Sequence, residues 1–298
     1  MSNAPDPGKG LPPVVPPSGR FIVQLFLVPG LIVGGLLFVV WALTMLSGAG
    51  RVGSSKDYLA NLRSANPDIR WRTAADLAQV LRTDQKLAED VDFGLELTEV
   101  YRQALDDLRR FEKEAVEPPG ESSGDTAQKL TKARQKFLSQ RSYVQYLGNC
   151  LGNLRTPVGE VALAGVARNP AVSDEKSAAL LRRQAVWSLA ALGHNLQEVQ
   201  RGPAERKAAI LEQLDRAPVS STDARRAADS LRGKGRSAAI EALLECAEAD
   251  DPFLRKLTAH ALTFWSGTPA EDRRIEDALL RLARDDGHGT AIVLTEKD

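Results

Sequence analysis

Apolar residues follow two different patterns along the chain. Residues 21–50 form a run of thirty residues without a charged side chain, and Arg20 and Arg51 bound it. About 20 apolar residues in a helix span the roughly 30 Å hydrocarbon core of a bilayer. The run therefore predicts one transmembrane helix that contacts the lipid bilayer through residues 21–50. The alternatives are a cleaved signal, whose apolar region is usually about 7–15 residues, and a buried core helix.

Downstream of this run, apolar residues recur at steps of three and four, which is the spacing of amphipathic helices. The pattern extends over residues 56–285 and predicts an all-α domain. Its longest elements are expected to form a helical hairpin over residues 89–154. The individual helices are predicted over 56–63, from Pro67 onward, and over 89–115, 125–154, 157–168, 174–193, 203–216, 222–231, 237–248, 252–265 and 269–284.

Proline and glycine mark the segments outside these helices. Residues 1–20 contain six prolines and are expected to form a disordered Pro-rich tail. Residues 51–55 are a Gly- and Ser-containing linker, and a Pro/Gly/Ser loop over 118–124 connects the long hairpin. Residues 286–298 form a C-terminal tail, whose apolar stretch 290–294 is either a cap on the last helices or a docking site.

The two halves of the long hairpin carry opposite charge. Residues 84–125 hold thirteen acidic and five basic side chains, whereas residues 126–155 hold six basic side chains and no acid. Antiparallel packing of an acidic helix on a basic one is the expected use, because each exposed pair adds a few tenths of a kcal/mol. A hairpin that docks a partner is the alternative.

An apolar residue followed by arginine opens three of the predicted helices, at Ile69-Arg70, Leu181-Arg182 and Leu254-Arg255. In each case apolar residues follow at offsets of five, eight and eleven from the first residue. Asn66-Pro67 precedes the first copy and Asp251-Pro252 precedes the third. Asn and Asp favour the N-cap, and proline is tolerated at the first helical position, so these pairs mark helix starts. The shared register predicts a structural repeat.

These features resemble the HEAT-repeat family, whose units are antiparallel helix pairs with a capping residue and proline at the turn. The resemblance covers residues 56–285 and implies an α-solenoid of HEAT-like hairpins. It also implies that turn residues and arginines form a ladder between neighbouring repeats. Onto this chain the resemblance carries the repeat-turn positions Asn66 and Asp251 and the ladder arginines Arg70, Arg182 and Arg255.

Composition and motifs give little support for catalysis. Lys plus Arg equals Asp plus Glu at 39 each, so no net positive charge indicates a nucleic-acid partner. The two cysteines, Cys150 and Cys246, lie among apolar residues and are expected to be buried thiols. Cys246 and His260 could approach each other across one hairpin as a thiol–imidazole pair, but such a proximity is expected to be incidental. No cofactor, metal site or catalytic residue is predicted.

The sequence thus favours a membrane-anchored scaffold that binds a protein partner and is not an enzyme. A chromophore-lyase-like or other enzyme on HEAT-like repeats is one alternative. A structural envelope protein that oligomerises through Gly34-Gly35 is another, since small residues let membrane helices approach closely. The expected location is single-pass in a bacterial inner membrane, with the helical domain in the cytoplasm.

Overall fold

The chain divides into two units, residues 1–54 and 55–298, each considered by itself. The computed structural model describes residues 27, 30–39, 41, 53–116, 125–170, 172–234 and 236–285. The predicted tails 1–20 and 286–298 and the predicted loop 118–124 lie outside the described residues.

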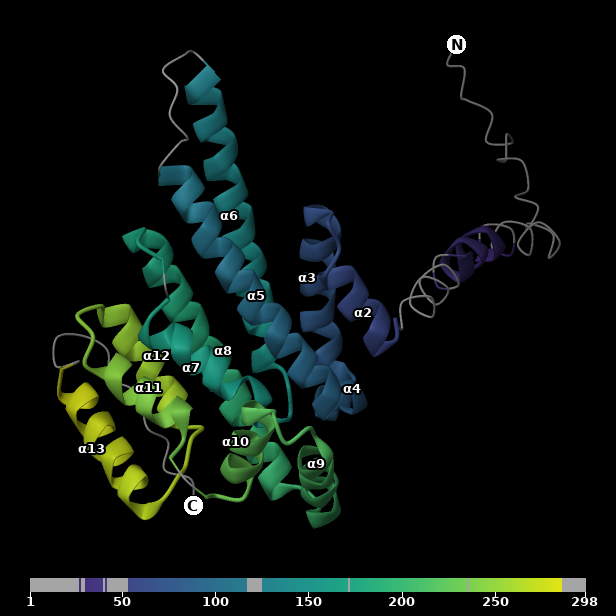
Figure 1. The fold of residues 1–298 in the computed structure, drawn as a ribbon. Coiled ribbons are helices and arrows are strands. Elements are labelled where there is room, and N and C mark those ends of the chain that lie inside the picture. The colour runs from purple at the N-terminus through teal and green to yellow at the C-terminus, as the bar shows by residue number, and fades with distance from the viewer. Residues whose placement is uncertain are drawn as a thin grey trace, which may run out of the picture. The chain divides into compact units, whose positions relative to one another are not determined.

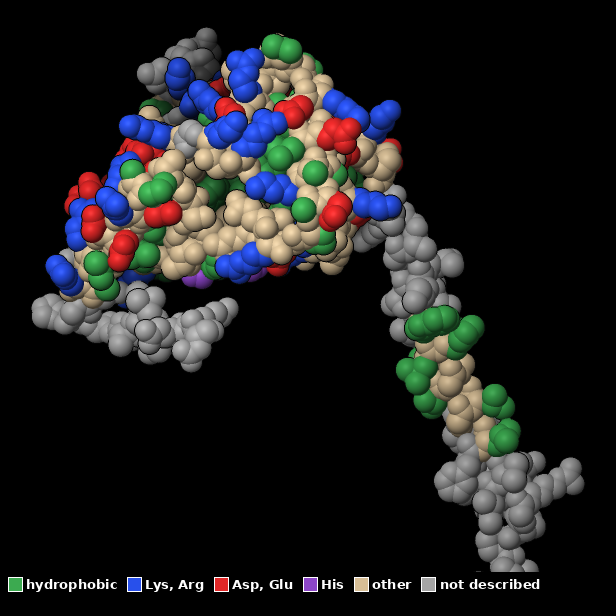
Figure 2. Space-filling view, turned by 90° about the horizontal axis from the view of Figure 1, so that it is seen from below, with side chains coloured by type: hydrophobic (Ala, Val, Ile, Leu, Met, Phe, Trp, Pro, Cys, Tyr) green, Lys and Arg blue, Asp and Glu red, His purple; other side chains and the backbone are tan. Residues whose placement is uncertain are grey.

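Among the described residues of the first unit, 27, 30–39 and 41 are helical and uncharged. Their large apolar side chains are 53–67% exposed, and Figure 2 shows several of them in green on the outside of this segment. Of the predicted anchor 21–50, only residues 27, 30–39 and 41 are described. Within the described part of the chain, no helix combines the length and apolar character needed to cross a membrane.

Every regular element in the described part of the second unit is a helix, which confirms the all-α prediction (Figure 1). Helices rather than strands form here because apolar residues recur at the helical period and capping residues stand at the predicted starts. The elements are α2 (Ser55–Leu62), α3 (Pro67–Thr83), α4 (Gln85–Glu89), α5 (Val91–Val116), α6 (Asp125–Gly152), η1 (Pro157–Gly159), α7 (Glu160–Arg168), α8 (Glu175–Arg201), α9 (Ala204–Arg216), α10 (Thr222–Leu231), α11 (Ala238–Ala247), α12 (Pro252–Leu262) and α13 (Pro269–Asp285).

Two layers of helices build the core of this unit. In one layer α2 packs on α5, α5 on α7, α7 on α11, and α11 on α13. In the other layer α3 packs on α6, α6 on α8, and α8 on α12. Partners within a hairpin also pack on one another, as α5 does on α6 and α7 on α8 (Figure 1). The apolar faces of both layers therefore close on one continuous core.

The repeat register predicts the buried positions well in two of its three copies. In α8, Val186, Leu189 and Leu192 are fully buried, and Leu181 is buried before them. In α3, by contrast, Ile69 is 42% exposed, so its predicted place on the buried face is wrong. Helix α8 packs on α6 and α12, and α12 packs on α8 and α13, whereas α3 stands at the start of its layer and packs on α6, α2 and α4.

The α9–α10 pair lies beside the two layers. The sequence predicts helices over 203–216 and 222–231 as part of the solenoid, but α11 packs on α7 and α12 on α8 without them. The pair contacts α5 instead, where the Val91 amide donates to Gln213 Oε1 at 3.1 Å and Arg102 pairs with Asp223 at 2.6 Å. Tertiary contacts along α5 therefore decide where this pair lies.

Helix α8 extends beyond its predicted end at Gly193 and continues to Arg201. Gly193 lies inside the helix, where its missing side chain makes room for Trp265. A Cβ atom at Gly193 would lie 2.6 Å from Trp265 Nε1, and that indole nitrogen donates to the Leu189 carbonyl at 3.0 Å. The close approach of α8 and Trp265 requires the missing side chain.

The long hairpin forms as predicted, but its charges are used differently. The predicted inward residues of α5, from Phe93 to Phe111, are buried. Among the described side chains, one ion pair joins α5 to α6, Glu114 with Lys136 at 3.3 Å. Several acids of α5 pair with arginines of α5 itself, such as Asp107 with Arg110 at 2.7 Å. Hydrophobic packing therefore holds the hairpin together, and much of the basic surface of α6 faces solvent.

Candidate interaction surface

The predicted ladder arginines Arg182 and Arg255 contact carbonyls of their own hairpins. Arg182 Nε donates to the Ala167 carbonyl at 3.1 Å, and Arg255 Nη1 donates to the Ala249 carbonyl at 2.9 Å. Both acceptors stand at the end of the preceding helix, where carbonyls lack helical partners. Both arginines therefore cap helix ends of their own hairpins, and Arg182 Nη2 also lies 4.0 Å from Cys246 Sγ of α11 in the neighbouring hairpin.

The third predicted ladder arginine, Arg70, lies in a different environment from Arg182 and Arg255. Its guanidinium carbon lies 5.2 Å from the centroid of the Tyr143 ring, and its Nε atom is buried without a hydrogen-bond partner. Asn66, the capping residue before it, accepts a bond from the Asp68 amide at 2.9 Å. Asn66 thus caps α3 as predicted, while no ion pair of the Arg70 side chain is seen within the described part of the chain.

One ion pair does join neighbouring hairpins at the predicted turn. Asp251 accepts from Arg183 Nε at 2.8 Å, and Arg183 also lies over the Phe253 ring at 5.0 Å. The Arg183 guanidinium holds the pKa of Asp251 below its ordinary value. The pairing partner is therefore the residue after Arg182, because that side chain points toward α12 while Arg182 points back toward α7.

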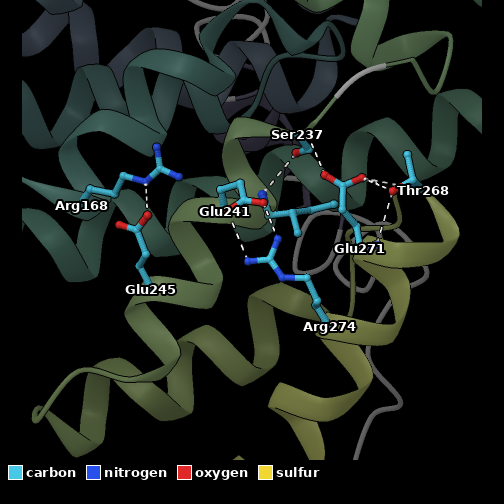
Figure 3. A network of polar contacts seen from close by, with 8 residues as sticks. Arg168, Ser237, Glu241, Glu245, Thr268, Glu271 and Arg274 are labelled. Carbon is cyan, nitrogen blue, oxygen red and sulfur yellow. Dashed lines mark hydrogen bonds and ion pairs between the residues drawn. The ribbon is translucent and has the colours of Figure 1, made fainter.

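Polar contacts also connect the first-layer helices α7, α11 and α13 (Figure 3). Arg168 of α7 pairs with Glu245 of α11 at 3.1 Å, and Glu241 of α11 pairs with Arg274 of α13. The bond from Arg274 holds the pKa of Glu241 below its ordinary value. These ion pairs are partly exposed, so each contributes at most about 1 kcal/mol.

Two buried carboxylates fix the start of α11. Glu160 accepts from the Ser237 hydroxyl at 2.7 Å and from the Ala239 amide at 3.1 Å. Glu271 accepts from the Ser237 amide at 3.1 Å and from the Thr268 amide at 2.8 Å (Figure 3). Internal donors satisfy these oxygens, and negative charge is favourable at a helix N-terminus, so the network has a structural role.

Four aromatic rings form a surface where α8 and α12 meet: Trp187 and His194 of α8, His260 of α12, and Phe264 just after α12. The Trp187 ring stacks on His260 with centroids 6.3 Å apart. Phe264 receives both imidazoles edge-on, at 5.0 Å from His260 and 5.3 Å from His194. Trp187 is nevertheless 51% exposed, and Figure 2 shows imidazole (purple) at the edge of the domain. We call these four residues the aromatic surface.

The structure shows no contact between the described side chains of Cys246 and His260, because each has other partners. Cys246 Sγ donates to the Ala167 carbonyl at 3.3 Å, whereas the His260 ring contacts Trp187 and Phe264. Burial raises the pKa of the Cys246 thiol, against a smaller opposite effect of Arg182. A protonated, buried thiol is a poor nucleophile. Among the described residues, no group of three His, Cys, Asp or Glu side chains converges as metal ligands.

Sequence reasoning missed the aromatic surface, although a signal for it was present. Val186, Leu189 and Leu192 define the buried stripe of α8. Trp187 follows Val186 directly and is therefore rotated by about 100° from that stripe. A large aromatic residue outside the buried stripe indicates an exposed contact residue, and His194 lies seven positions further on the same face.

No protein-family model matches this chain, and no curated protein is similar to it in sequence. The candidate site therefore rests on geometry: three exposed rings and the partly buried Phe264 ring, placed where α8 and α12 pack side by side.

Proposed function

We propose that this chain is a membrane-anchored scaffold of HEAT-like helical hairpins that binds another protein through the aromatic surface. The two-layer packing of α2 to α13 supports the HEAT-like α-solenoid, because such repeats stack hairpins so that each contacts its neighbours. The turn features at Asn66-Pro67 and Asp251-Pro252 support the same assignment.

The anchor is residues 21–50. Its support is the run of thirty residues without charge and the exposure of the apolar side chains from Leu27 to Trp41. A contiguous exposed apolar surface of this kind marks contact with lipid or another protein. The proposed setting is a single pass through a bacterial inner membrane, with the helical domain in the cytoplasm. The free thiols of Cys150 and Cys246 fit a reducing compartment.

The aromatic surface is the observation that carries the binding function. Tryptophan is enriched among the residues that dominate protein–protein affinity, because it presents a large rigid area. Trp187 leaves about half of its surface to solvent, although the neighbouring Trp265 is almost fully buried. A partner that covers Trp187 and Phe264 would remove this apolar area from water.

Photo-crosslinking in intact membranes tests the proposal. A photoreactive phenylalanine analogue replaces Trp187 in the full-length chain, and a matched control places it at Leu280, which is 52% exposed on α13. We expect a crosslinked product of one defined mass from position 187 and none from position 280. Equal products from both positions, or none from position 187, would contradict a specific partner at the aromatic surface.

Fractionation tests the anchor separately. We expect the full-length chain to remain in membranes during alkaline extraction, and a chain lacking residues 21–50 to be released. Protease added outside sealed inner-membrane vesicles of known orientation should digest the helical domain only when its cytoplasmic face is outward. Release of the full-length chain by alkali would disprove the anchor without affecting the crosslinking result.

A further inference from the structure

A second, chemically different site lies between α3 and the α5–α6 hairpin. It is a groove of about 350 Å³. Its lining includes Arg70 of α3, Phe111 of α5, and Lys132, Gln135, Lys136 and Ser139 of α6. Three of its side chains are cationic and none is acidic. We call it the basic groove, and it is separate from the aromatic surface on α8 and α12.

Arg70 is the central observation. The guanidinium is partly buried against the Tyr143 ring, at 5.2 Å from the ring centroid, and its Nε atom is buried without a partner. A buried donor without an acceptor is costly, and for a charged group the cost is higher. Arg182 and Arg255, which occupy the same place in the repeat, both donate to helix-end carbonyls. Arg255 also lines a groove, but acidic residues Glu248 and Asp250 share that lining, whereas the groove at Arg70 has no acidic lining residue.

The lysines of α6 add to this charge. Lys136 lies over the Phe111 ring, with Nζ 3.8 Å from the centroid, and its one acidic partner, Glu114, stands outside the groove lining at 3.3 Å. Lys132 is exposed and has no ion pair with any described side chain. The nearby carboxylate of Asp107 pairs with Arg110 at 2.7 Å. The positive charge of the groove is therefore only partly balanced by the protein.

Uncharged donors stand on the same face of α6. Gln135 and Lys136 follow Lys132 by three and four positions, and Ser139 follows them by four and three, so the four side chains project from one side of the helix. The Gln135 amide and the Ser139 hydroxyl supply neutral hydrogen-bond donors beside the cations. By contrast Gln140 uses its amide nitrogen internally, donating to the Ala104 carbonyl at 2.9 Å. The combination suits an oxyanion with several acceptor oxygens.

We propose that the basic groove binds a phosphate group. The guanidinium of Arg70 provides planar, paired donors that match phosphate oxygens, and lysine acts as a point charge beside it. A volume of about 350 Å³ is at the lower end of ligand pockets, so the ligand is the size of a phosphorylated small molecule or a phospholipid headgroup. Both sources share the same chemistry, and the binding does not depend on the aromatic surface.

Titration of the full-length chain in a neutral maltoside detergent tests the groove. The probes are inorganic phosphate and dihexanoyl phosphatidylglycerol, followed by ³¹P line broadening, with dihexanoyl phosphatidylcholine as the zwitterionic comparison. The variants are Arg70→Gln and Lys132→Gln, and the control is Arg109→Gln, which removes an exposed cation of α5 paired with Asp106. We expect saturable binding that weakens at least tenfold in Arg70→Gln and severalfold in Lys132→Gln, with no change in Arg109→Gln.

Each outcome decides a different point. Arg70-dependent binding of inorganic phosphate identifies a soluble phosphorylated ligand, and Arg70-dependent binding of phosphatidylglycerol alone identifies a lipid headgroup. Equal weakening in Arg70→Gln and Arg109→Gln, or no saturable binding of either probe, overturns the proposal. Binding of a glutamate-rich peptide that requires Arg70, without binding of either phosphate probe, also overturns it in favour of an acidic protein segment. Lys132 is exposed, so its variant remains informative if Arg70→Gln fails to fold.

Discussion

The packing of α3 on α6 and the packing of α8 on α12 use the same local motif with different results. In both cases a capping residue precedes a second-layer helix, and a proline or serine stands near that cap. Within its first turns the helix carries an apolar residue followed by arginine. At α8–α12, Arg182 donates to a helix-end carbonyl, and Arg183 pairs with Asp251. Exposed rings lie at the same helix contact. At α3–α6, the Nε atom of Arg70 is buried without an acceptor, and Lys132 and Lys136 line the same groove. Neighbouring helices therefore decide what the motif does.

This comparison shows which contacts are structural and which are available to a ligand. Satisfied groups such as Glu160 and Arg182 hold helices together. Exposed rings and an unsatisfied guanidinium are the groups that a partner or an anion would complete. That division can be tested by measuring the unfolding free energy of variants of the full-length chain with urea in mild detergent.

The largest effect is expected from Trp265→Ala. The side chain is only 8% exposed and donates to the Leu189 carbonyl, so its removal leaves a cavity between α8 and α12. We expect a loss of about 3–5 kcal/mol in unfolding free energy. The matched control is Trp187→Ala, which should cost less than about 1 kcal/mol because half of that side chain is exposed. Equal losses would show that Trp187 is part of the core.

Adding one methyl group to the same contact should have the next largest effect. In Gly193→Ala the new Cβ would lie 2.6 Å from Trp265 Nε1, and the overpacking should cost about 1–3 kcal/mol. Gly165→Ala in α7 is the control, since nothing lies within 4 Å of its added Cβ. That variant should be stabilised by about 0.5–1 kcal/mol through helix propensity. A neutral Gly193→Ala would disprove the close approach.

Replacing the repeat arginines Arg182 and Arg70 should lower the unfolding free energy by different amounts. Arg182→Gln deletes the donor to the Ala167 carbonyl, and we expect a loss of about 1–2 kcal/mol. Arg70→Gln deletes only the contact with the Tyr143 ring among the interactions described, and it should cost less than about 1 kcal/mol. A larger loss in Arg70→Gln than in Arg182→Gln would mean that Arg70 is a structural residue instead of a ligand-binding one.

The smallest effect concerns acid stability. Arg183 holds the pKa of Asp251 below its ordinary value of 3.8, so the pair stabilises the folded state above the unfolded pKa and is lost as pH falls through the folded pKa. Asp251→Asn keeps a capping oxygen, as Asn66 does, and removes the charge. Since both side chains are partly exposed, solvent screens the pair, and we expect a loss of about 0.5 kcal/mol at pH 7. That loss should disappear as the pH falls from the ordinary pKa of 3.8 through the lowered folded pKa of Asp251. Asp250→Asn is the control and should show no such pH dependence.

Local sequence predicted helices better than it predicted their ends and neighbours. The starts at Pro67 and Pro252 are confirmed because capping and proline act within one turn. The predicted end of α8 at Gly193 is wrong, since that glycine serves the packing of Trp265, 72 residues away in the segment after α12. The ladder was transferred to Arg182, whereas the observed pair uses Arg183. The aromatic surface and the basic groove were not predicted, because each combines residues from different hairpins.

The sequence by itself determined that the second unit is all-α, where most of its helices begin, and which face of each helix is apolar. These properties depend on interactions within a few residues, namely helical periodicity, capping and turn residues. Only the tertiary structure decided that α9–α10 lies beside the layers, that Arg70 lacks an acceptor, and that Trp187, His260 and Phe264 meet on one surface. Those outcomes depend on which helices become neighbours, and helix spacing along the chain does not encode that choice.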